Sequence, residues 1–316
     1  MTSAQARPPL PFQPGKPIGN LYCGTCGWTD RTLINAGTFY PPTARTAADR
    51  LAYYASQFPI VEVDSTYYAL PSERNAQLWA ARTPPDFIFN IKAFSLFTHH
   101  PVEVGRLPVA IKRLLPADFA EKNRIYMRDV PEEARTLVWE MQAQALAPLI
   151  AAGKLGCMLF QFPRWFTARR DHIDYLKRLR DRSDWPIAVE FRGGGWMTGD
   201  DRAKTLALLE TLGFAYVVVD EPQGFRSSTP PIVASTSPLA VVRFHGQNAE
   251  TYEKPNIGVA ERFRYLYTEE ELKGWVAPIH SLAHRADRVH VLMNNCYGDY
   301  GVRNARQLAE LLTAMS

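Results

Sequence analysis

The stretch Ile187-Ala188-Val189-Glu190-Phe191-Arg192, followed by Gly193-Gly194-Gly195, decides how the rest of the chain is interpreted. Its β-branched and aromatic residues favour a strand. Because side chains alternate across a strand, Glu190 and Arg192 share one face, whereas Val189 and Phe191 take the other. The glycines then end the pairing and let other backbone approach closely. The stretch therefore predicts a buried strand that carries an acid and a base on one face, near its end.

Seven further segments have the apolar character of buried strands, and most of them alternate with segments of helical periodicity. In chain order the eight predicted strands are 21–24, 60–64, 87–92, 155–161, 187–192, 215–220, 239–245 and 289–295. Alternating strands and helices indicate a parallel sheet, and eight such units indicate a closed (β/α)8 barrel. An open, doubly wound sheet is the alternative, but it gives no reason for the chain to stop after the eighth unit.

Two connections depart from the regular pattern. Residues 93–130, after the third strand, are longer than an ordinary connection and are interpreted as an insertion or lid. Residues 221–238, after the sixth strand, contain four prolines and no helical periodicity, so we expect no full helix there. The sequence thus predicts a leader at 1–20 and a single TIM-like barrel domain at 21–316.

The composition sets broad limits on function. The chain has 316 residues, 46% of them hydrophobic, which is enough for a large core. A formal charge of +4 is compatible with small anionic ligands or weak nucleic-acid contact. No apolar run approaches the ~18 residues of a membrane span, and residues 1–20 lack a signal-peptide core. We therefore expect a flexible leader, no membrane association and a cytoplasmic location. Four cysteines do not make a disulfide scaffold.

Polar side chains gather where a barrel of this kind places its active site, at the carboxyl ends of the strands. Four strands end in polar pairs on one face, and three more end in a single polar residue. They are Glu62 and Asp64, Asn90 and Lys92, Glu190 and Arg192, Arg243 and His245, and then Gln161, Asp220 and Asn294. Buried charges are costly unless they are paired, so these need partners or a ligand. The alternative is a polar plug whose members satisfy one another.

These residues predict an enzyme that binds a small polar or anionic substrate, bearing phosphate or carboxylate, and acts by acid/base chemistry of the hydrolase, lyase or isomerase type. Glu190 and Asp64 are the candidate acid and base, and His245 has the right chemistry to titrate near neutral pH. The predicted substrate-binding residues are Glu62, Lys92, Gln161, Arg192, Asp220, Arg243 and Asn294, with Trp28 and Tyr67 as aromatic residues at the rim.

Other functions have weaker support. A divalent metal could be held by Glu62, Asp64, Glu190, Asp220 and His245, but no second histidine ends a strand, so no metal ligand or cofactor is predicted. A nucleic-acid-associated protein would use the basic insertion and the rim aromatics, although acidic residues interrupt that basic segment and a solvated surface is favoured. A non-catalytic, partner-binding barrel has no positive feature in the sequence.

Closure of the barrel would bring Cys26 and Cys296 together.

Several motifs resemble the YecE-like family, the domain of unknown function 72. They include Gly24-Thr25-Cys26-Gly27-Trp28, Val61-Glu62-Val63-Asp64-Ser65-Thr66-Tyr67-Tyr68, Phe89-Asn90-Ile91-Lys92, Gln161-Phe162-Pro163, Val189-Glu190-Phe191-Arg192 and Val242-Arg243-Phe244-His245-Gly246. The matches run in order along nearly the whole chain. The resemblance implies a TIM-like barrel and no particular activity. The family usually has serine at the position of Cys26, which argues against a shared mechanism that depends on that thiol.

Overall fold

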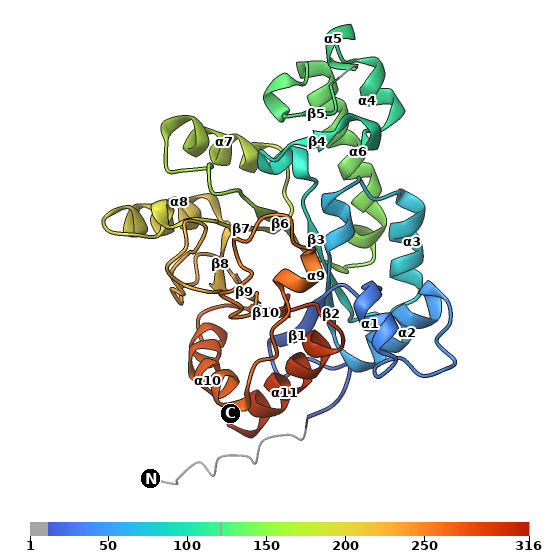
Figure 1. Cartoon of the computed structure of the whole chain (residues 1–316), viewed down its shortest axis with the longest axis vertical. Coiled ribbons are helices and arrows are strands. Elements are labelled where there is room, and N and C mark those ends of the chain that lie inside the picture. Colours follow the sequence, from blue (N-terminus) through green and yellow to red (C-terminus); the bar gives the residue numbers. More distant parts are fainter. Residues whose placement is uncertain (1–11, 121, 316) are drawn as a thin grey trace.

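The computed structural model describes residues 12–120 and 122–315, and within them eight parallel strands close into a barrel (Figure 1). The strands are β1 (Leu21–Cys26), β2 (Ile60–Val63), β3 (Ile88–Lys92), β6 (Leu155–Gln161), β7 (Ile187–Glu190), β8 (Ala215–Asp220), β9 (Leu239–Phe244) and β10 (Arg288–Met293). Their order around the barrel is β1-β10-β9-β8-β7-β6-β3-β2, with β1 also paired to β2. The predicted single TIM-like barrel is confirmed.

Helices follow most of the strands, and the longer ones surround the barrel (Figure 1). They are α1 (Arg31–Ala36), α2 (Ala47–Gln57), α3 (Glu73–Ala81), α6 (Glu132–Ala151), α7 (Arg170–Asp181), α8 (Asp201–Leu212), α9 (Val259–Arg262), α10 (Glu269–Ala283) and α11 (Tyr300–Ala314). The start of α10 is fixed by a capping box between Thr268 and Glu271, as the spacing of those residues predicts. Residues 221–238, all of which are described, form no helix between β8 and β9, which confirms the expectation for this segment.

The insertion after β3 folds into small elements of its own. These are the two-stranded antiparallel sheet of β4 (Val102–Glu103) and β5 (Arg124–Ile125), and the short helices α4 (Val109–Arg113) and α5 (Ala117–Ala120). They lie next to α6 at one end of the molecule (Figure 1). Ile111 and Ile125 are fully buried and join the main core, so the insertion packs as part of the domain.

Several strands end earlier than the sequence predicted. Strand β2 ends at Val63 and β7 at Glu190, so that Asp64 starts a 3-10 turn and Arg192 lies beyond the ladder. The chain leaves the sheet after β7 because the backbone groups that follow this strand form hydrogen bonds with loop residues instead of with a neighbouring strand. Gly193, for example, has φ +102 and donates its N–H to the carbonyl of Ser227 at 2.9 Å. The close backbone approach expected of these glycines is therefore present at Gly193.

The two faces of the barrel strands have different partners, as the alternation predicts. Outward side chains such as Phe89 and Val189 join the main core under the helices. Inward side chains such as Leu159, Ala188 and Val217 fill the lumen as a separate apolar cluster. Polar side chains that follow these inward positions along the strands therefore lie above an apolar floor, at the carboxyl ends of the strands.

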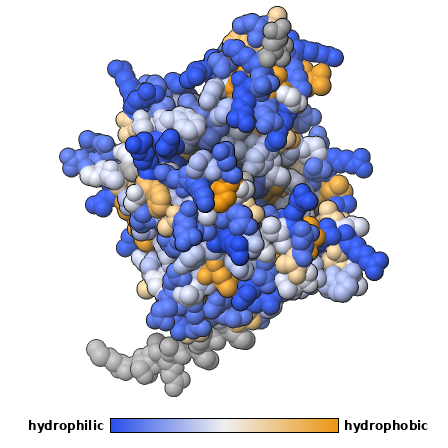
Figure 2. Space-filling view, viewed as in Figure 1, coloured by the Kyte–Doolittle hydropathy of each residue, from blue (hydrophilic) through white to orange (hydrophobic). Residues whose placement is uncertain are grey.

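The predicted leader is described only in part, since residues 1–11 lie outside the described residues. From residue 12 onward the chain contacts the barrel domain: Lys16 pairs with Asp86 at 2.8 Å, and Asn20 donates to the carbonyls of Ala283 and Ala286 at 2.9 Å. The face shown in Figure 2 is largely hydrophilic, with small separate hydrophobic patches. Over 12–120 and 122–315, no helix combines the length and the apolar character needed to cross a bilayer.

Candidate functional site

Arg243 is the centre of a buried network of charges at the carboxyl ends of the strands. Its side chain has 0% exposure, and each of its three guanidinium nitrogens donates to a carboxylate. Nε and Nη2 bind the two oxygens of Glu62 at 3.0 and 2.5 Å, and Nη1 binds Glu190. This bidentate and bridging geometry supplies the pairing that a buried guanidinium needs.

Glu190 joins four side chains. Its Oε2 accepts from Arg243, and its Oε1 lies 2.9 Å from Nε of Arg192, 2.8 Å from Nε2 of Gln161 and 3.2 Å from Nε2 of His245. Burial alone would raise the pKa of Glu190, but Arg243 and Arg192 outweigh it and hold that pKa well below its usual range. Glu190 is therefore an ionised anchor at neutral pH, which suits it to positioning charge and not to donating a proton.

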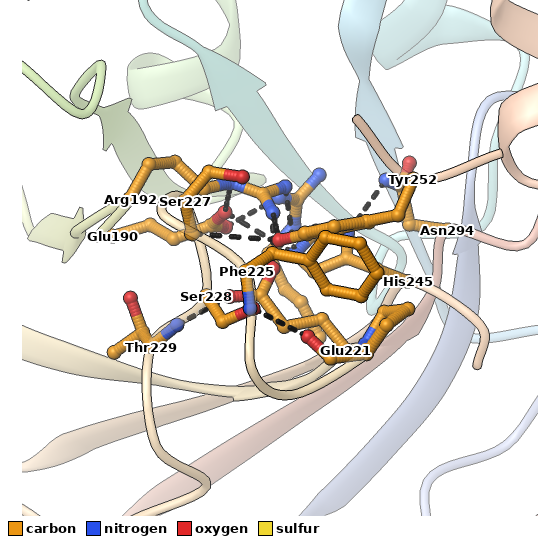
Figure 3. Close-up of polar contacts among 12 residues, drawn as sticks. Glu190, Arg192, Glu221, Phe225, Ser227, Ser228, Thr229, His245, Tyr252 and Asn294 are labelled. Atoms are coloured by element: carbon orange, nitrogen blue, oxygen red, sulfur yellow. Dashed lines mark hydrogen bonds and ion pairs between the residues drawn. The ribbon is translucent and has the colours of Figure 1, made fainter. Parts of the chain in front are cut away.

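Beyond Arg192 the network ends at Glu221, a residue that the sequence analysis missed. Arg192 donates to Glu221 and to the hydroxyl of Tyr252 at 3.2 Å, and Glu221 also accepts from the backbone N–H of Thr229 at 2.8 Å (Figure 3). Residues 221–229 and Tyr252 thereby cover this end of the network (Figure 3). The alternation of side chains could have predicted Glu221. Val217 and Val219 face the lumen, and Glu221, two residues further on, is expected on the same face.

His245 lies between the two ends of the network. Its Nε2 is 3.2 Å from Glu190 and 3.1 Å from Arg192, and Asn294 donates to its Nδ1 at 2.8 Å (Figure 3). With Nδ1 accepting, the ring proton is assigned to Nε2, facing Glu190. Burial, together with Arg192, lowers the pKa of His245 to about 3, so the ring is neutral at physiological pH. It is placed as an orienting group.

Glu62 and Asp64 form a second, more accessible part of the site. The two carboxyl groups are neighbours, with oxygens within 4.8 Å of each other, and Lys92 lies 3.3 Å from Asp64 and 5.3 Å from the ring centre of Tyr67. Glu62 is fully buried, whereas the side chains of Asp64 and Lys92 are 32% and 15% exposed. Burial raises the pKa of Glu62 to about 8. Burial also acts to raise that of Asp64, but Lys92 and Arg243 outweigh it and lower the pKa. Burial thus favours the protonated form of Glu62, whereas Lys92 and Arg243 favour the ionised form of Asp64.

The comparisons with known proteins agree with this architecture. The sequence model of the family described as "Protein of unknown function DUF72" matches residues 22–316. The chain belongs to the DUF72 family. It is 31% identical to the UPF0759 protein YunF of Bacillus subtilis over 298 residues, which cover 92% of this chain and 94% of that protein. The resemblance inferred from the motifs is confirmed.

Solved DUF72 structures share the fold. A DUF72 family protein from Thermotoga maritima is 32% identical with a TM-score of 0.72, covering 92% of this chain and 98% of its own. One from Enterococcus faecalis is 25% identical with a TM-score of 0.74, covering 92% and 95%. Neither description states a substrate or a reaction, so the chemistry must be argued from the side chains.

Two predicted site residues of this DUF72 protein lie apart from the network. Asp220 is on the outward side of β8, where it accepts from Gln247 and hydrogen-bonds Tyr267, between the barrel and α10. Trp28 is buried, with 8% exposure, and packs edge-to-face on Trp79 at 5.9 Å. Within the described residues, neither forms a hydrogen bond with the carboxyl pair or with Arg192. Tyr67, by contrast, is half-buried beside Lys92 at the rim.

One group of side chains at the barrel mouth could in principle offer ligands to a metal ion. Cys26, Glu62 and Asp64 each offer one ligand atom, all within 4.8 Å of one another. Both oxygens of Glu62 are already bound to Arg243, and Lys92 adds a second positive charge. A divalent cation would have to displace a guanidinium, so the donor set fits a cation poorly. Cys296 does lie beside Cys26, donating to its carbonyl at 3.3 Å, but burial raises the pKa of both thiols, which disfavours a reactive thiolate.

Proposed function

We propose that this DUF72 protein is an enzyme that binds a small polar, anionic substrate at the barrel mouth and uses the carboxyl pair Glu62 and Asp64 for acid/base chemistry. The observation that carries the proposal is the geometry of the pair: the fully buried Glu62 is held by Arg243, and the neighbouring Asp64 is 32% exposed and pairs with Lys92 at 3.3 Å. Neighbouring carboxyl groups whose environments separate their pKa values characterise acid/base sites. Asp64 would serve as the base, and the protonated member of the pair as the acid.

The surrounding charges support an anionic group on the substrate. With Glu62 protonated, the remaining carboxylates Asp64, Glu190 and Glu221 balance the cations Lys92, Arg192 and Arg243. A phosphate or carboxylate entering the mouth would therefore meet no net negative charge, and it could pair with a cation that remains partly exposed. Arg243 is sealed, whereas the side chains of Lys92 and Arg192 retain 15% and 14% exposure. Lys92 is the better candidate to contact the substrate, because it pairs only with the accessible Asp64.

A ligand screen tests the proposal directly. Wild type and Lys92→Met would be melted with phosphorylated sugars, small carboxylates and neutral sugars, with Lys204→Met as a control on the exposed face of α8. An anionic ligand at 100 times its dissociation constant should add about 2.7 kcal/mol to wild type and to the control, and far less to Lys92→Met. Turnover of that ligand should fall by about 10²-fold or more in Asp64→Asn. The proposal would be refuted if a ligand stabilised all three proteins equally, or if no ligand stabilised wild type.

The raised pKa of Glu62 predicts a particular pH dependence of stability. Folded Glu62 keeps its proton to about pH 8, whereas a free glutamate loses it near 4.5, so the folded chain binds more protons in this window. The free energy of unfolding must then fall as pH rises through the window. Glu62→Gln mimics the protonated acid, so wild type should lose about 1–3 kcal/mol more than the variant between pH 5 and pH 8.5. Urea denaturation at several pH values measures this, and parallel profiles would contradict the raised pKa of Glu62.

A further inference from the structure

A cleft of about 640 Å³ lies beside the barrel mouth, and none of the predicted site residues lines it. Its walls come from the end of the insertion (Tyr126 to Arg128), from the first half of α6 and from α7. His99 and Trp165 complete it, and they follow β3 and β6, the strands that carry Lys92 and Gln161. The volume is that of a small-molecule site. The cleft is therefore a second candidate site, built from residues other than those of the carboxyl pair.

Positive charge exceeds negative charge in this cleft. Five arginines line it against a single carboxylate, Asp171. Asp171 pairs with Arg169 at 3.1 Å, and the nearby Glu132 pairs with Arg135 and Arg182. Both carboxylates are about two-thirds exposed, so these pairs are weak and exchangeable.

Two of the cleft arginines have no ion pair at all. Within the described part of the chain, neither Arg128 nor Arg178 forms an ion pair with a carboxylate, and both side chains belong to exposed residues. Arg128 lies over the ring of Tyr126 at 4.7 Å, which holds its guanidinium on the cleft wall. Two guanidinium groups without counter-ions, facing one cavity, are suited to bind the oxygens of a phosphate group.

Aromatic surface accompanies these charges. Trp139 is stacked on Phe97, with ring centres 4.1 Å apart, and this contact fixes the floor of the cleft. Trp165 is 51% exposed, and its indole N–H donates to the carbonyl of His99 at 3.3 Å, so a large apolar ring is held in place while one side stays open. The Nε2 atom of His99 is buried and has no hydrogen-bond partner among the described residues. A ligand that filled the cleft would cover the open ring of Trp165.

We propose that the cleft binds a nucleoside phosphate, with its phosphates on Arg128 and Arg178 and its base stacked on Trp165. An inorganic anion would use the arginines alone and leave most of the 640 Å³ and the exposed indole unoccupied. A nucleoside phosphate combines the two chemistries that the cleft offers, since each base has a stacking face and each phosphate takes a guanidinium. The same group occurs as a free nucleotide and at the end of a single strand. The volume favours one nucleotide unit.

Calorimetric titration of the full chain tests this inference. The probes are ADP, adenosine, pyrophosphate and a twelve-nucleotide single strand, at about 50 mM salt, where phosphate contacts are strong. ADP should bind wild type at least tenfold more tightly than either adenosine or pyrophosphate does. The variant Arg128→Ala/Arg178→Ala should lose at least tenfold in affinity for ADP. The matched control Arg124→Ala/Lys177→Ala removes two exposed cations from β5 and α7 outside the cleft, and it should change that affinity less than twofold.

Further variants separate the alternatives. Trp165→Ala should weaken ADP at least fivefold while leaving pyrophosphate unchanged, and Glu62→Gln should leave ADP binding intact, so the result does not depend on the carboxyl pair. Tighter binding of the strand than of ADP, lost in the same arginine variant, would identify the strand end as the source of the nucleoside phosphate. The inference is overturned if ADP fails to bind, if pyrophosphate binds as tightly as ADP, or if the control loses as much affinity as the cleft variant.

Discussion

Replacing Arg243 by methionine is expected to lower the free energy of unfolding by about 3–5 kcal/mol, because it takes a cationic partner from the buried, ionised Glu190 and both hydrogen bonds from the buried Glu62. Glu62 and Glu190 both have fully buried side chains, and each would lose its bond to the guanidinium. Chemical denaturation at pH 7 measures the loss. Arg106→Met is the matched control: this arginine pairs with Glu103 at 2.9 Å, but both side chains are about half exposed, and removing it should cost less than about 1 kcal/mol.

A second variant shows whether the loss arises from charge. Adding Glu190→Gln to Arg243→Met removes the carboxylate whose pKa lies well below its usual range. Part of the lost stability should therefore return. Non-additivity of this kind is what a double-mutant cycle detects. If Glu190→Gln instead lowers the free energy of unfolding of Arg243→Met by as much as it lowers that of wild type, the network acts through packing. The electrostatic account of its stability would then be wrong.

Gly24→Ala is expected to destabilise the barrel by about 3 kcal/mol or more, since a methyl group there has no space. A Cβ at this position would lie 2.1 Å from the carbonyl oxygen of Ile60 and 2.9 Å from its Cγ2. The nearest obstacle is backbone at the β1–β2 pairing that closes the barrel, and it cannot rotate away. Thermal and chemical denaturation measure the effect. Gly105→Ala, where a Cβ would meet no atom within 4 Å, should stay within about 0.5 kcal/mol of wild type.

The sequence predicted the barrel well because its signals are local. Alternation along each strand separated Leu159 and Ala188, which face the lumen, from Val189, which faces the helices. The absence of a helix after β8 followed from prolines and lost periodicity. The count of eight units then implied closure, and the pairing of β1 with β10 and β2 agrees with it.

The site was predicted less completely, since its details depend on one-residue shifts and on distant pairings. Asp220 and Glu221 are adjacent, yet only Glu221 points to Arg192, because successive side chains take opposite faces. Arg192 was expected to bind substrate, and its partners include Glu190, Glu221 and Tyr252, the last of which comes from the loop after β9. The arginine cleft joins segments from three separate parts of the chain, and no spacing within the sequence indicates that assembly.

The loop after β8 has a further consequence for how the protein fluctuates. Glu221 is bonded to the N–H of Thr229, the hydroxyl of Thr229 donates to the carbonyl of Phe191 at 2.8 Å, and Gly193 donates to Ser227. Lifting this loop would therefore break the backbone contacts of the segment that follows β7 and uncover the pairing of Arg192 at the same time. Opening the loop would uncover the buried Glu221 and its ion pair with Arg192, so we expect the backbone N–H of Thr229 to exchange with solvent more slowly than that of an ordinary surface loop.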